Sequence, residues 1–76
     1  MPNQDLVTWA QFVEKWDSRL QGQDGEDRDA VHFALRQTEF NGNAAHRKQA
    51  FLHHLKGENG TLASNARREA ENYLPF

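Results

Sequence analysis

The chain contains no cysteine, and it has only two prolines and five glycines among its 76 residues. Without cysteine there is no disulfide framework and no thiolate-ligated metal, so packing alone must hold the fold together. A chain of this length forms one domain, residues 1–76, which buries only about 60% of the surface that the unfolded chain exposes. The glycines are scattered singly, which is typical of the ends of helices.

Long apolar runs are also missing. No segment approaches the roughly 18–20 apolar residues needed to cross a bilayer. The N-terminal residues have neither the basic region nor the apolar region of a secretory signal. We therefore expect a cytoplasmic protein that does not enter membranes. Hydrophobic residues make up 37% of the chain and aromatic residues 11%, which favours a folded core over disorder.

The sequence carries no signature of catalysis. Its two serines, Ser18 and Ser64, lie outside any Gly-x-Ser-x-Gly turn, and it has neither a cysteine nucleophile nor a glycine-rich phosphate loop. A helical metal site would pair ligands four residues apart, and neither His46 nor His53 has a ligand at that spacing. We predict that the protein is not an enzyme and binds no cofactor or metal.

Hydrophobic periodicity predicts an all-α fold, a compact bundle of three to four short helices at about 9–20, 25–39, 44–56 and 62–74. The predicted core residues recur every three or four positions on the apolar faces of these helices: Trp9, Val13, Trp16, Leu20, Val31, Leu35, Phe51, Leu55, Ala66 and Tyr73. Either both tryptophans are core residues, or one of them is half covered and anchors a partner.

Short polar residues predict where these helices begin. Thr8 and Gln11 have the spacing of a capping box, with Val7 and Phe12 as a hydrophobic staple. The N-caps expected for the second, third and fourth helices are Asp24 or Asp27, Asn43, and Thr61 or Ser64. Gly22 and Gly57 are expected to end the first and third helices.

Charge is unevenly distributed along this chain of net charge −2. Residues 1–30 carry seven acids and three bases, whereas residues 31–76 carry six bases and four acids. The acids concentrate in residues 24–29, and the basic segment 44–56 holds three of the four histidines. Such polarity favours oriented binding to a charged partner, or head-to-tail self-association.

These features favour a non-catalytic protein–protein interaction module, such as a small regulator, an inhibitor or an accessory subunit, that binds another protein or itself. The preferred surface is the outer face of the third helix, formed by His46, Arg47, Gln49, Ala50, His53 and His54. The second candidate is the acidic start of the second helix, formed by Asp24, Glu26, Asp27 and Asp29.

The alternative is an accessory protein that binds nucleic acid through its basic C-terminal half. Its predicted phosphate contacts are Arg47, Lys48, Arg67 and Arg68. Two observations disfavour it. The domain is acidic overall, and Lys48 falls in the middle of the apolar stripe that would anchor a recognition helix.

Overall fold

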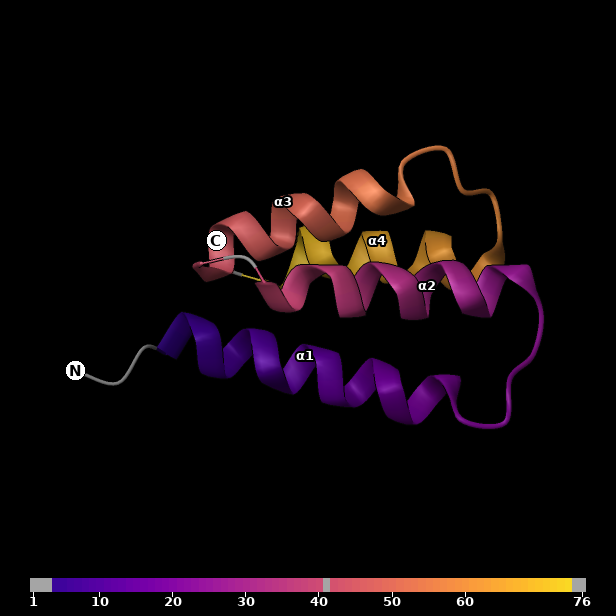
Figure 1. Cartoon of the computed structure of the whole chain (residues 1–76), viewed down its shortest axis with the longest axis horizontal. Coiled ribbons are helices and arrows are strands. Elements are labelled where there is room, and N and C mark those ends of the chain that lie inside the picture. Colours follow the sequence, from indigo (N-terminus) through magenta and orange to yellow (C-terminus); the bar gives the residue numbers. More distant parts are fainter. Residues whose placement is uncertain (1–3, 41, 75–76) are drawn as a thin grey trace.

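The computed structural model describes residues 4–40 and 42–74, and within these ranges the chain consists of helices joined by short connections and has no strand. Its elements are α1 (Gln4–Leu20), α2 (Glu26–Gln37), the short 3-10 helix η1 (Thr38–Phe40), α3 (Ala44–Leu55) and α4 (Thr61–Tyr73). Successive helices alternate in direction along the long axis of the molecule, with α2 in the middle (Figure 1). The predicted all-α bundle is therefore confirmed. No described helix is both long and apolar enough to span a membrane.

The hydrophobic core surrounds α2, which packs against the other three helices. Among the predicted core residues, Val13 is only partly buried, and the side chain of Tyr73 lies outside the described part of the chain. The other eight are buried. Trp9 is 2% exposed and Trp16 is 1% exposed, so the alternative in which one tryptophan anchors a partner is wrong.

Three aromatic rings join α1 to α3. The ring centroids of Trp9 and Phe12 lie 5.5 Å apart, and Phe51 meets both rings edge-on at 5.8 and 5.5 Å. Such edge-to-face pairs contribute about 0.5–1.5 kcal/mol each beyond the area they bury. On the other side of the core, α4 presents the small residues Ala63, Ala66 and Ala70, all fully buried, which let its backbone approach α2 closely.

The predicted start of the first helix is wrong. The helix begins at Gln4, so Thr8 lies inside it and cannot be its N-cap, and Val7 is 52% exposed rather than part of a staple. Residues 4–7 include neither proline nor glycine, so nothing stops the helix from extending ahead of Thr8. The predicted end is correct: Gly22 adopts a φ of 80° just after the helix.

The predicted N-caps of α2 and α4 are also wrong, and one residue explains both errors. Gly25 precedes α2 and Gly60 precedes α4, and neither position provides a side-chain cap. The carboxylate of Asp27, in the first turn of α2, instead accepts hydrogen bonds from the backbone N–H groups of Leu62 (2.8 Å) and Ala63 (2.9 Å). A carboxylate of α2 therefore caps α4.

At α3 the predicted ends are confirmed. The side chain of Asn43 accepts a hydrogen bond from the N–H of His46 at 2.9 Å, and Gly57 takes a φ of 85° after the last turn. The carbonyl of Leu55, near the end of α3, accepts a further hydrogen bond at 2.9 Å from the guanidinium of Arg67 on α4. The ends of α3 and α4 are thus stabilised by residues of neighbouring helices.

Ion pairs attach α1 to the rest of the bundle. Glu69 of α4 contacts Arg19 at 2.8 Å and Lys15 at 3.2 Å, both on α1. On α2, Arg36 contacts Asp17 of α1 at 2.8 Å. These pairs support the position of α1 against α2 and α4, beside the aromatic contacts in the core.

Candidate functional site

The six residues predicted as one face of α3 cover two adjacent sides of the helix. At 100° per residue, Ala44, Phe51 and Leu55 turn toward the core, and all three are buried. The exposed side chains of His46, Gln49 and His53 lie opposite the core. The remaining three, Arg47, Ala50 and His54, lie on the flank of α3 that faces α2 and η1.

Two contacts show that this flank of α3 faces η1 and α2. The guanidinium of Arg47 donates a hydrogen bond to the backbone carbonyl of Glu39 in η1 at 3.4 Å. The imidazole of His54 meets the ring of Phe33 on α2 edge-on, with centroids 5.5 Å apart and planes at 90°. The six predicted residues therefore span a broad arc of α3, and the two groups meet where the rings of His53 and His54 lie edge-on with centroids 6.0 Å apart.

An acidic and aromatic hollow lies between α2 and the end of α3. We call it the Phe33 patch, and it is formed by Glu26, Asp29, Ala30, Phe33, His54 and Glu58. Its volume is about 460 Å³. It combines Glu26 and Asp29 from the predicted acidic surface with His54 from the predicted histidine surface. Of the other acids in that prediction, Asp24 is exposed outside the patch and Asp27 caps α4.

Phe33 is the residue that sequence reasoning missed. Its ring is 54% exposed, whereas the rings of Trp9, Phe12, Trp16 and Phe51 are buried. The signal was present in the sequence, because Phe33 lies off the stripe of Val31, Ala34 and Leu35. A helix with a second apolar side is normally covered by a neighbour, and only the packing of α3 reveals that this ring stays uncovered.

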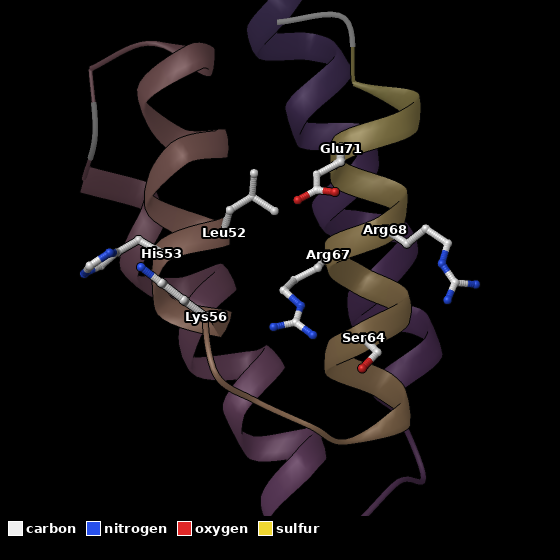
Figure 2. A pocket seen from close by; sticks show the side chains of 7 residues that line it. All are labelled: Leu52, His53, Lys56, Ser64, Arg67, Arg68 and Glu71. Atoms are coloured by element: carbon white, nitrogen blue, oxygen red, sulfur yellow. The ribbon is translucent and has the colours of Figure 1, made fainter.

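A second hollow, which we call the basic groove, runs between α3 and α4. It is lined by Leu52, His53, Lys56, Ser64, Arg67, Arg68 and Glu71, and its volume is about 690 Å³. Figure 2 shows Leu52 and Arg67 between the two helices, whereas Lys56 extends outward from α3 toward His53 and Arg68 extends outward from α4.

The four predicted phosphate contacts do not form one surface. Arg67 and Arg68 line the basic groove, but Arg47 lies on the opposite flank of α3, where it lines a hollow beside α1. Lys48 is partly buried, one turn before Leu52. In the sequence Lys48 falls in the apolar stripe of this helix, and its partial burial fits that position. A lysine there can pack its stem on the core and keep its charge in water.

Neither hollow has the composition of a metal centre. In residues 4–40 and 42–74, no three histidine, aspartate or glutamate side chains are grouped so that they could hold an ion. What the two hollows offer is instead charge of opposite sign on the two flanks of α3.

Comparison with known proteins gives no relative from which a function could be transferred. No family model matches the chain, and no curated protein and no solved structure matches it.

Proposed function

We propose that this protein is a non-catalytic interaction module that binds a basic segment of a partner protein through the Phe33 patch. The exposed ring of Phe33 carries the proposal. A small domain that buries Trp9, Phe12, Trp16 and Phe51 but leaves the ring of Phe33 54% exposed presents a ready anchor for a partner.

The ring can contribute binding energy at low entropic cost. Fully burying a phenylalanine side chain is worth about 1.5–3 kcal/mol, so covering the exposed half gives roughly 1 kcal/mol. The edge-on contact with His54 restrains the ring before any partner arrives, which reduces the rotamer entropy lost on binding.

The charges around the ring define the partner. The carboxylates of Glu26, Asp29 and Glu58 line the same hollow, and the side chain of Asp29 is 73% exposed. Within residues 4–40 and 42–74, Asp29 pairs with one cation, Arg28 of the preceding position, at 3.5 Å. A segment with lysine or arginine beside an apolar side chain would match this patch, and its association would be accelerated by attraction between opposite charges.

Affinity capture from the source cell tests the proposal. The tagged protein is compared with Phe33→Ala and with Val7→Ala, a matched control in which another exposed apolar residue (52%) is truncated on α1. Nuclease treatment removes proteins bridged by nucleic acid. We expect a partner captured by the unmodified protein and by Val7→Ala but lost with Phe33→Ala, with capture that weakens as salt rises.

Both substitutions affect exposed side chains, so the melting temperatures of the two variants should stay close to that of the unmodified protein. Capture that survives Phe33→Ala, or no captured protein at all, would contradict the proposal. Sedimentation at several concentrations distinguishes a partner protein from a second copy of the chain.

The nucleic-acid alternative has weaker support. Its four cations are divided between the two flanks of α3, and the chain carries a net charge of −2. A binding surface for a nucleic-acid backbone would be expected to gather its cations along one face.

A further inference from the structure

We infer that the basic groove is a second binding site, independent of the Phe33 patch, and that it accepts a short acidic peptide segment of a partner protein. Three features of the groove support this inference: a guanidinium held in place at its centre, flanking cations without acidic partners, and an apolar residue between the helices.

The guanidinium is that of Arg67. Its Nη1 donates to the carbonyl of Leu55 at 2.9 Å, which fixes the side chain across the groove. A guanidinium has five N–H donors in a planar fork, so several remain after this bond. They suit a carboxylate, which arginine binds with two parallel hydrogen bonds, and the fixed side chain loses little entropy when it does so.

Lys56 and Arg68 lie at the two rims of the groove, and in Figure 2 their charged ends extend away from Arg67, Lys56 outward from α3 and Arg68 outward from α4. Both are exposed, and within the described part of the chain neither forms an ion pair. Their long stems can turn toward a ligand that lies on Arg67. With both side chains turned inward, three arginine and lysine cations would face one acid, Glu71, among the described lining residues, in a chain whose overall charge is negative.

The observations favour a peptide over a nucleic acid. Single-stranded nucleic acids are usually held by aromatic rings on which bases stack, and among the side chains that the structure describes, no phenylalanine, tyrosine or tryptophan lines the groove. Leu52 lies there instead and suits an aliphatic side chain. Glu71 would also repel a continuous row of phosphates, whereas a peptide can place its acids selectively beside Arg67, Lys56 and Arg68.

Titration with a short fluorescent peptide composed of glutamate and leucine tests the site, using the full chain at low salt. Lys56→Glu and Arg68→Glu should each weaken binding by about tenfold, which corresponds to roughly 1.4 kcal/mol. Glu71→Gln should have the opposite effect and tighten binding, because it removes the one acid in the groove. Arg67 is left unchanged in this series because it also stabilises the end of α3.

Arg28→Glu is the matched control, since it makes the same change in net charge on α2, outside the groove. It should leave peptide affinity within about twofold. Phe33→Ala should leave it unchanged as well, which separates this site from the proposed function. Equal affinity for all variants, or no binding of the peptide at low salt, would overturn the inference. So would a single-stranded oligothymidylate that binds more tightly than the peptide.

Discussion

At the scale of single residues, Asp27 is where local reasoning fails. An aspartate at the start of a helix is normally read as the cap of that helix, because the positive helix N-terminus favours it. Here its carboxylate accepts from Leu62 and Ala63, 35 and 36 positions further along the chain. Propensity and spacing describe neighbours in sequence, so they cannot reveal a cap that forms only after α2 and α4 have packed together.

Asp27→Ala should lower the free energy of unfolding by about 1–2 kcal/mol, because two N–H groups of α4 lose a charged acceptor. Asp27→Asn should cost less, since its single carbonyl oxygen still accepts. Urea unfolding followed by circular dichroism measures both. The control is Asp24→Ala, an exposed acid that should change the free energy by less than about 0.5 kcal/mol. Equal stability of the two alanine variants would show that the α4 cap contributes nothing.

At the scale of elements, the sequence predicts the helices well and their ends less well. The apolar periodicity that identifies Trp16, Leu35 and Leu55 as core residues depends only on 3.6 residues per turn, a local property of the chain. The confirmed ends, at Asn43 and Gly57, are likewise local. Where an end depends on another helix, as at the start of α4, the sequence prediction is wrong.

Gly60 reveals how closely α2 and α4 approach. Its φ of −69° suits any residue, but a Cβ placed there would overlap the Asp27 carboxyl group. Gly60→Ala should therefore cost about 1–3 kcal/mol of the free energy of unfolding, as other overpacked contacts do. In the Asp27→Ala background this cost should fall by about 1 kcal/mol or more, because the overlapping group is gone.

A double-mutant cycle with denaturant unfolding measures this coupling between the two helices. Gly42→Ala serves as the control, because a Cβ at Gly42 meets nothing within 4 Å and its φ is not positive. That variant should be neutral or more stable by up to about 1 kcal/mol. Strictly additive effects of the Asp27 and Gly60 substitutions would contradict the close contact between α2 and α4.

At the scale of the whole molecule, α3 separates two hollows of opposite charge. The sequence indicated this polarity in its acidic first half and basic second half, and it identified Glu26, Asp29 and His54, which lie in the Phe33 patch. It could not show that Arg47 lies against η1 and His54 against Phe33 of α2. Nor could it show that Phe33 stays uncovered, because exposure depends on how neighbouring helices pack.

The central claim is that the partner docks on the Phe33 patch, and site-specific photocrosslinking in the source cell tests it most directly. The photoreactive amino acid p-benzoylphenylalanine replaces Phe33 in one variant and Val7 in another, so that an aromatic side chain is kept at the proposed contact. Irradiation should join a partner protein to the chain labelled at position 33 and not to the chain labelled at position 7. A partner crosslinked from position 7 alone, or none from position 33, would contradict the claim.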